Sequence, residues 1–194
     1  AGYNSPFALR VIDSQNLFSA QGIGVVEAVR MRAAGAGVQQ IRERLEELAL
    51  NTHGYMVPPD LYYLRNRARS KGDRSVSLFS AALGTALDIK PILHCNRGET
   101  APVGKVKGFE PAVQKLFEFA ISRIRAGLMT PTMCVSYGGE LSVLRALPGY
   151  TRLVETCAAN DVELFESVMS LTGMVNVGKG AIVLGFAAPP HTFA

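Results

Sequence analysis

The chain has 194 residues, of which 48% are hydrophobic and 19% are charged, with 20 Lys and Arg against 16 Asp and Glu. This composition, with a mean hydropathy of +0.16, is typical of a globular protein with a sizeable core and excludes a disordered tail, a collagenous repeat or a coiled coil. No apolar run reaches the roughly 18 residues that a membrane-spanning helix needs, so we expect no membrane span. A strand-like run follows closely on Ala1, which indicates a fragment of a longer polypeptide.

The first quarter of the chain predicts one strand, two helices and a second strand. Residues 9–12 are a short β-branched run and read as a buried strand. Apolar residues recur at helical spacing over residues 19–33, with Ser19 as the expected N-cap, and a second amphipathic helix is expected over residues 38–48. Residues 52–57 predict the next strand.

The middle of the chain contains an uncharged apolar stretch and a hairpin. Residues 75–87 carry no formal charge, and a helix that is apolar nearly all round must be buried or line an apolar space. Residues 89–95 and 100–107 predict two strands joined by an Asn-Arg-Gly turn. Pro111 begins a strong amphipathic helix that Gly127 ends.

The last third predicts three more strands around one helix. Strands are expected over residues 132–136 and 162–168, a helix over residues 150–159, and a central strand in the continuous apolar run 182–186. Because strands and helices alternate irregularly and one hairpin is present, the fold class is α+β. We expect a two-layer mixed β-sheet with helices mainly on one face.

The sequence offers no catalytic constellation. The three cysteines and three histidines are widely separated, so neither a metal site nor a nucleophile–base pair follows from spacing, and reduced thiols are expected. A dinucleotide-binding loop is excluded at Gly22 and Gly24, because Glu27 stands where a third glycine belongs, and close helix packing explains these glycines better. The Gly-Lys-Gly segment at residues 178–180 is either a tight turn or a short anion-binding loop.

A basic run spans residues 65–74 and follows two tyrosines. Such a run can be a solvated surface, a docking patch for an acidic partner, or a nucleic-acid-binding segment. Composition alone leaves these three readings open.

Four segments, in order and in register, resemble the DegV family of proteins. Residues 10–24 resemble its V-I-D-S-x-x-x-S-x-G-x-G segment, and residues 52–65 its T-H-x-x-F-V…L-x-Y-L-R stretch. Residues 82–93 (ALGTALDIKPIL) are similar to L-L-G-x-L-L-N-I-K-P-I-L, the most specific match, and residues 103–108 are similar to V-x-K-V-R-G. The resemblance therefore extends over most of the chain.

The resemblance implies a function and a domain organisation. DegV-family proteins are two-domain, non-enzymatic cytoplasmic carriers that bind a long-chain fatty acid and present its carboxylate to a fatty-acid kinase. By this likeness residues 1–18 are a remnant of the N-terminal α/β domain, and residues 19–194 are the C-terminal lipid-binding domain. The missing N-terminal domain, the fatty acid and the kinase are then the expected partners. No cofactor is expected, and a nucleic-acid-binding or regulatory module that uses residues 65–74 is the less favoured alternative.

The same likeness implies a ligand site. The family's G-G-R-I-S arginine falls at or next to Arg74, and its H-T-G-P-G loop matches residues 176–180, with Asn176 in place of the histidine and Lys179 in place of the proline. Asn176 can form hydrogen bonds but cannot carry a proton charge near neutral pH. Apolar walls are expected from the uncharged stretch and the strand after it. The ligand-binding residues that we predict are Arg74, Asn176, Gly178, Gly180, Phe79, Leu83 and Ile92.

Overall fold

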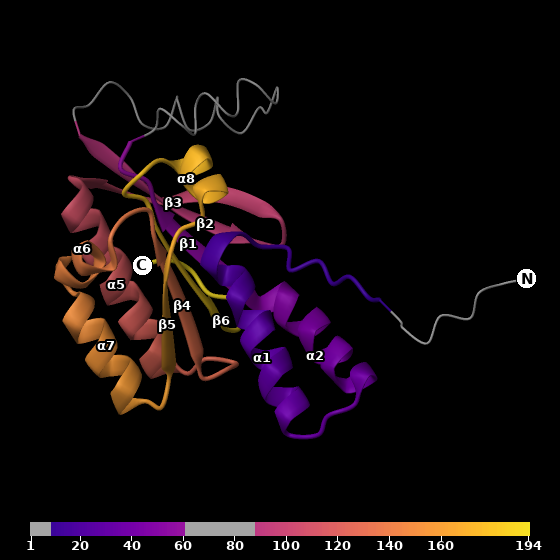
Figure 1. Cartoon of the computed structure of the whole chain (residues 1–194). Helices are drawn as coiled ribbons and strands as arrows, with labels where there is room; N and C mark the ends of the chain where they lie inside the picture. The colour runs from indigo at the N-terminus through magenta and orange to yellow at the C-terminus, as the bar shows by residue number, and fades with distance from the viewer. Residues whose placement is uncertain (1–8, 61–87) are drawn as a thin grey trace, which may run out of the picture.

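The computed structural model describes residues 9–60 and 88–194, and within them a six-stranded mixed sheet is at the centre of the fold (Figure 1). The strands are β1 (Thr52–Val57), β2 (Ile89–Asn96), β3 (Glu99–Lys107), β4 (Thr132–Tyr137), β5 (Glu163–Val168) and β6 (Ile182–Ala187). Their order across the sheet is β3-β2-β1-β6-β4-β5, with β4 and β5 parallel and every other neighbouring pair antiparallel. The expected hairpin is the β2–β3 pair, and the apolar run at β6 is an inner strand as predicted.

Helices lie against both faces of this sheet (Figure 1). The helical elements are the 3-10 turn η1 (Phe18–Ala20) and the helices α1 (Gln21–Ala33), α2 (Val38–Asn51), α5 (Phe109–Ala126), α6 (Leu141–Ala146), α7 (Tyr150–Ala159) and α8 (Leu171–Val177). Helices α5, α6 and α7 cover one face, while η1, α1, α2 and α8 lie on the other. The α+β class and the mixed sheet are confirmed. In the parts that the structure describes, no helix combines the length and the apolar character needed to cross a membrane.

The main core lies between the sheet and α5. Helix α5 directs Leu116, Phe117 and Ala120 at the sheet, where Tyr55 and Leu184 meet them, and all five are fully buried. Burial of each large apolar side chain contributes about 1.5–3 kcal/mol, so this layer supplies much of the stability of the fold. The periodicity of α5 in the sequence predicts this face.

On the opposite face the chain packs against glycines. Gly185 of β6 lies beneath η1, and a Cβ atom there would meet the Cα of Ala20 at 2.5 Å. Its cross-strand partner Gly54 lies beneath Asn16, and a Cβ atom there would meet Asn16 Oδ1 at 2.6 Å. The side-chain amide of Asn16 in turn donates to the carbonyl oxygens of Thr52 and Cys95. The absence of side chains at this glycine pair allows η1 to approach the sheet closely.

The glycines of α1 have the packing role that the sequence indicates. A Cβ atom on Gly22 would meet Cys134 Sγ at 3.1 Å, and one on Gly24 would meet Leu45 of α2 at 3.6 Å. Small residues on α1 therefore allow β4 and α2 to approach it closely.

Some local predictions are wrong. Residues 9–12 are not a strand in the structure, because no other described segment pairs with them, and a strand-forming sequence needs a partner for its backbone groups. Ser19 is not an N-cap: it lies within η1, and its hydroxyl donates to the carbonyl of Val183 at 2.9 Å. The tail after β6 belongs to the fold as well, since His191 and Phe193 pack onto Tyr55 and Phe119.

Candidate lipid-binding site

Helix α8 and the turn after it hold the described part of the predicted head-group site. Ser170 caps the helix, its hydroxyl oxygen accepting a hydrogen bond from the backbone N–H of Gly173 at 3.1 Å. The helix ends at Gly178, whose φ of +96° is accessible to glycine at little cost. This short helix places Asn176 one turn after Thr172, on the side that is half-buried.

The side chain of Asn176 is bonded at one end and unpartnered at the other. Its Nδ2 donates to the carbonyl of Thr172 at 2.7 Å, whereas its Oδ1 is buried and has no hydrogen-bond partner in the part of the chain that the structure describes. A buried amide oxygen without a partner costs about 1–3 kcal/mol in the free protein. Asn176 therefore retains both an acceptor and a second N–H for a bound group.

The turn over residues 178–180 is a tight turn rather than a loop with free amides. The N–H of Gly178 donates to Met174, and the N–H of Gly180 donates to Gly138, both at 2.8 Å. Gly180 has a φ of +86°. Both glycine amides are thus used within the protein, so a ligand at this turn must be contacted by the neighbouring side chains.

An uncharged cluster lies beside α8 on the same face of the sheet. Met56, Leu93 and Val183 stand in register on three adjacent strands, so their side chains form one continuous apolar surface. All three are at most 2% exposed. The whole set, which we name the α8 cluster, consists of Met56, Leu93, Met169, Val177, Ala181 and Val183 with Phe18 and Met174 packed against it.

The structure brings only some of the predicted site residues together. Asn176, Gly178 and Gly180 lie next to one another, whereas Ile92 points to the other face of the sheet, into the core beneath α5. The neighbouring Leu93 belongs to the α8 cluster instead. The predictions at Arg74, Phe79 and Leu83 lie outside the described residues.

The α8 cluster contains residues that sequence reasoning did not select. Met56, Met169 and Val183 are apolar positions on expected strands or directly after one, and Met174 lies on a helix too short to show a periodic pattern. Strand alternation alone could have placed Met56 and Val183 on one face, although it does not say which face meets the ligand.

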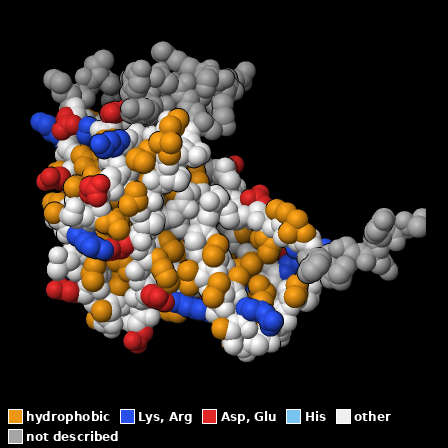
Figure 2. Space-filling view, in the orientation of Figure 1, with side chains coloured by type: hydrophobic (Ala, Val, Ile, Leu, Met, Phe, Trp, Pro, Cys, Tyr) orange, Lys and Arg blue, Asp and Glu red, His pale blue; other side chains and the backbone are white. Residues whose placement is uncertain are grey.

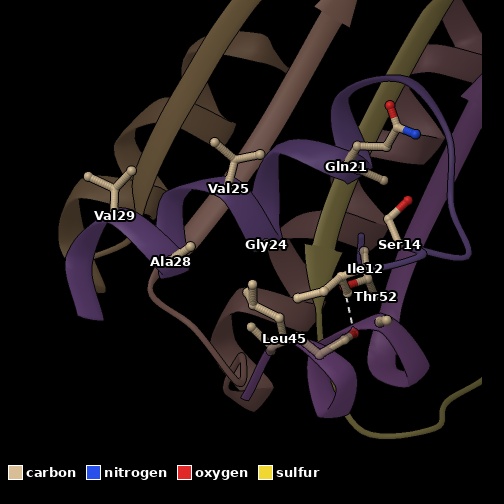
Figure 3. A pocket seen from close by; sticks show the side chains of 12 residues that line it. Ile12, Ser14, Gln21, Gly24, Val25, Ala28, Val29, Leu45 and Thr52 are labelled. Carbon is tan, nitrogen blue, oxygen red and sulfur yellow. Dashed lines mark hydrogen bonds between the residues drawn. The ribbon is translucent and has the colours of Figure 1, made fainter. Parts of the chain in front are cut away.

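A separate groove runs between α1 and α2 beneath the N-terminal segment (Figure 3). It has a volume of about 470 Å³, and Ile12 of the N-terminal segment and Leu45 of α2 both line it (Figure 3). Near it, Leu9 and Val11 of the extended segment are 86% and 89% exposed. We name this cavity the α1–α2 groove. Its walls are mainly apolar: Ile12, Ser14, Ala20, Gln21, Gly24, Val25, Ala28, Val29, Leu45, Leu48, Ala49 and Thr52.

The three histidines, far apart in the sequence, lie together at the other face of β1. His53 Nε2 lies 3.1 Å from the carbonyl of Ala188, which can only accept, so His53 is protonated at Nε2 and its Nδ1 accepts from His94 Nε2 at 2.9 Å. By the same reasoning His191 donates through Nδ1 to Pro189, and its Nε2 accepts from the Tyr55 hydroxyl at 3.0 Å. Every ring in this histidine cluster is therefore used in its neutral form.

Burial keeps this cluster neutral. Desolvation, reinforced by the neighbouring histidines, lowers the pKa of His53 to about 3 and that of His94 to about 4. Desolvation also lowers the pKa of His191. In residues 9–60 and 88–194 no three His, Cys, Asp or Glu side chains are arranged to hold a metal ion.

The cysteines also show no activated group. Cys95, Cys134 and Cys157 are buried free thiols, and burial raises the pKa of each to about 11. Each thiol is therefore protonated near neutral pH and is a poor nucleophile.

The family model and the relatives that match this chain all belong to one family. Residues 3–188 match the family model described as "Uncharacterised protein, DegV family". A DegV domain-containing protein of Xanthomonas campestris is 66% identical over all 194 residues, and a protein of the same description from Xanthomonas axonopodis is also 66% identical. This chain covers 62% of the length of each relative.

Solved structures share the fold at low sequence identity. DegV of Bacillus subtilis, described as a fatty acid binding protein, has a TM-score of 0.67 at 22% identity over 92% of this chain and 60% of its own. A DegV family protein of Eubacterium eligens, loaded with heptadecanoic acid, has a TM-score of 0.69 at 17% identity over 93% of this chain and 61% of its own. With the family model matching nearly the whole sequence, these findings show that the chain belongs to the DegV family.

Proposed function

We propose that this protein binds a long-chain fatty acid, with the hydrocarbon tail against the α8 cluster and the carboxyl group beside Asn176. The observation that carries this proposal is the continuous uncharged surface of Met56, Leu93 and Val183 beside α8, where the side-chain amide of Asn176 has a second N–H beyond its bond to Thr172. The fatty acids named for the solved relatives support the same ligand class.

The energetics favour a long apolar tail. Each buried methylene contributes about 0.8 kcal/mol before the cost of ordering the chain, so the tail dominates the affinity. The head group needs hydrogen-bonding or ionic partners, because burying an unpaired carboxyl group at an apolar site costs several kcal/mol of binding free energy. Asn176 has a second N–H to donate to a carboxylate oxygen, and we propose Arg74 as the cationic partner of that carboxylate. Phe79 and Leu83 are proposed as further walls, with Gly178 and Gly180 shaping the turn, whereas Ile92, on the opposite face of the sheet, is not part of this site.

We further propose that the protein is a carrier rather than an enzyme. In this proposal it presents the carboxylate to a fatty-acid kinase in the cytoplasm, and the basic run at residues 65–74 is the docking surface. This role rests on the family likeness. The alternative of a nucleic-acid-binding or regulatory module rests on the composition of that basic run alone.

We also propose that the remaining part of the family's longer proteins packs on the α1–α2 groove. Residues 9–12 have strand-forming side chains but pair with no other described segment. Leu9 and Val11, two alternate residues of this segment, expose their apolar side chains to solvent. A sheet in an N-terminal domain would provide the missing backbone partners and cover both side chains. In this proposal residues 1–18 are the remnant of that domain, and residues 19–194 are the C-terminal lipid-binding domain.

Replacing Asn176 by aspartate tests the head-group position. Asn176→Asp keeps the shape of the side chain but removes the donor and adds a negative charge beside the ligand carboxylate. Palmitate affinity at pH 7.5, measured by isothermal titration, is expected to fall about tenfold or more.

Asn160→Asp is the matched control for that substitution. Asn160 donates to the carbonyl of Thr156 at 2.8 Å, the same local bond that Asn176 makes, but it lies at the end of α7. Its replacement should leave palmitate affinity unchanged. Equal affinities of the two variants would remove Asn176 from the head-group site.

A further inference from the structure

A second groove lies between α1 and the β4–β5 edge of the sheet. It has a volume of about 440 Å³ and is separate from the α1–α2 groove, with α1 between the two. We name it the β4–β5 groove. Its lining residues are Phe18, Ser19, Gln21, Gly22, Val25, Val26, Cys134, Ser136, Phe165, Ser167, Val168, Met169 and Ser170.

A buried hydroxyl without a partner lines this groove. Ser136 is only 4% exposed, and its Oγ is buried and makes no hydrogen bond to any residue of the described ranges 9–60 and 88–194. It stands in register with Ser167 on β5, two residues from Cys134, so its side chain points to the same face of the sheet as α1. A buried hydroxyl without a hydrogen bond destabilises the folded protein, so a bound group that forms this hydrogen bond gains affinity.

The other hydroxyls in the lining are already bonded within the protein. Ser19 donates to the carbonyl of Val183, and Ser170 accepts from Gly173 as the cap of α8. Ser167 has only a long contact of 3.4 Å with the carbonyl of Val135. The amide of Gln21, also in the lining, donates to the carbonyl of Asn16. Ser136 is therefore the polar anchor of the groove, and Ser167 is positioned to assist it.

The rim of the groove is apolar and open to solvent. Val25 is 64% exposed, Val168 is 56% exposed and Phe165 is 37% exposed. In the view of Figure 2 apolar side chains reach the surface over α1 and the neighbouring strands. A ligand that covers these three side chains would gain affinity from the area removed from water.

Among the residues that the structure describes, the lining contains no charged side chain, and this decides the chemical class of the ligand. A carboxylate or a phosphate needs a cation or several donors, and a hydroxyl at the floor does not replace them. The thiol of Cys134 is not an anionic or covalent site either, because burial raises its pKa to about 11. The groove thus suits an uncharged molecule with one polar group.

We propose that the β4–β5 groove binds a neutral aliphatic alcohol, its hydroxyl bonded to Ser136 and its hydrocarbon against Val25, Phe165 and Val168. A serine hydroxyl both donates and accepts, which matches the hydroxyl of an alcohol. This site goes beyond the fatty-acid proposal, because a fatty acid would bring its carboxylate to a floor without a cation.

Titration with octan-1-ol, followed by amide and methyl NMR shifts, tests this site. The shifts should concentrate on the groove residues, and octanoate at pH 7.5 should bind more weakly than octan-1-ol. Ser136→Ala should weaken octan-1-ol binding about fivefold or more, while the unfolding midpoint stays the same or rises because an unbonded hydroxyl has been removed.

Thr130→Val is the matched control. The hydroxyl of Thr130 is also buried and unbonded, and Thr130 is not among the residues that line the groove. Like Ser136→Ala, this variant should have an unchanged or raised unfolding midpoint. Unlike Ser136→Ala, it should bind octan-1-ol as tightly as the unmodified chain. Equal weakening in both variants, no weakening in Ser136→Ala, shifts that lie elsewhere, or octanoate binding as tightly as octan-1-ol would each overturn the proposal.

Discussion

Replacing Gly185 by alanine is expected to destabilise the fold by about 3 kcal/mol or more, the upper end of what overpacking costs. The added Cβ would lie 2.5 Å from Ala20 Cα, 2.7 Å from Ala20 Cβ and 2.9 Å from the Ala20 nitrogen. Two of these are backbone atoms of η1, so no side-chain rotation relieves the clash. The measurement is urea unfolding followed by far-UV circular dichroism.

Gly24→Ala is the control for this substitution. A Cβ atom at Gly24 would meet only the end of the Leu45 side chain, at an ordinary contact distance of 3.6 Å. Alanine also favours a helix over glycine by about 1 kcal/mol, so this variant should be as stable as the unmodified chain or more stable. A Gly185→Ala protein within 1 kcal/mol of the unmodified chain would show that η1 does not pack on β6 as described.

Acid is expected to destabilise the fold through the histidine cluster. The folded-state pKa values of about 3 for His53 and about 4 for His94 lie below the ordinary value of 6.5 that these groups regain on unfolding. The unfolded chain therefore binds more protons, and the stabilisation is complete above pH 6.5 and is lost as pH falls toward the folded-state values.

The hydrogen bonds of the cluster also indicate that protonation destabilises the folded state. Protonation of His53 places an N–H at Nδ1 against the N–H of His94, and protonation of His191 places one against the hydroxyl of Tyr55, which must then turn away. Arg123 adds a positive charge that further opposes the protonation of His53 and His191. The free energy of unfolding should therefore fall by on the order of 3 kcal/mol between pH 7.5 and pH 5, discounted for partial exposure.

Urea unfolding as a function of pH measures this effect. All three histidines of the chain belong to the cluster, so no other histidine contributes to the slope of the unfolding free energy against pH. His94→Gln is the informative variant, because glutamine can still donate to His53 Nδ1 but does not titrate, and its slope should be smaller than that of the unmodified chain. A free energy of unfolding that is constant from pH 7.5 to pH 5 would contradict the burial of neutral histidines.

The sequence predicts the regular part of the fold well because the signals there are local. The strand over residues 52–57, the β2–β3 hairpin and the apolar face of α5 follow from alternation, turn residues and helical spacing. Helices α6 and α8 have only six and seven residues, too few to show a period, and were not predicted. Residues 9–12 have strand propensity but pair with no other described segment, and no local pattern can reveal this.

The candidate site is less predictable because it depends on pairing across the sheet. The likeness to the family places Asn176, Gly178 and Gly180 together, and the structure places them at one turn. The choice between Ile92 and Leu93 depends on which face of β2 meets α8, and the strand register shifts between these two residues. The histidine cluster likewise arises from the pairing of β1 with β2 and from the returning tail, not from any spacing along the chain.

Native mass spectrometry of the purified chain is the decisive test of fatty-acid binding. After extraction of bound lipid and re-addition of palmitate, we expect one added fatty-acid mass per chain. That mass should be lost on competition with a longer saturated fatty acid and retained with octan-1-ol, since the alcohol belongs to the β4–β5 groove. A chain that never carries a fatty-acid mass, either as purified or after re-addition, would contradict the proposed carrier function.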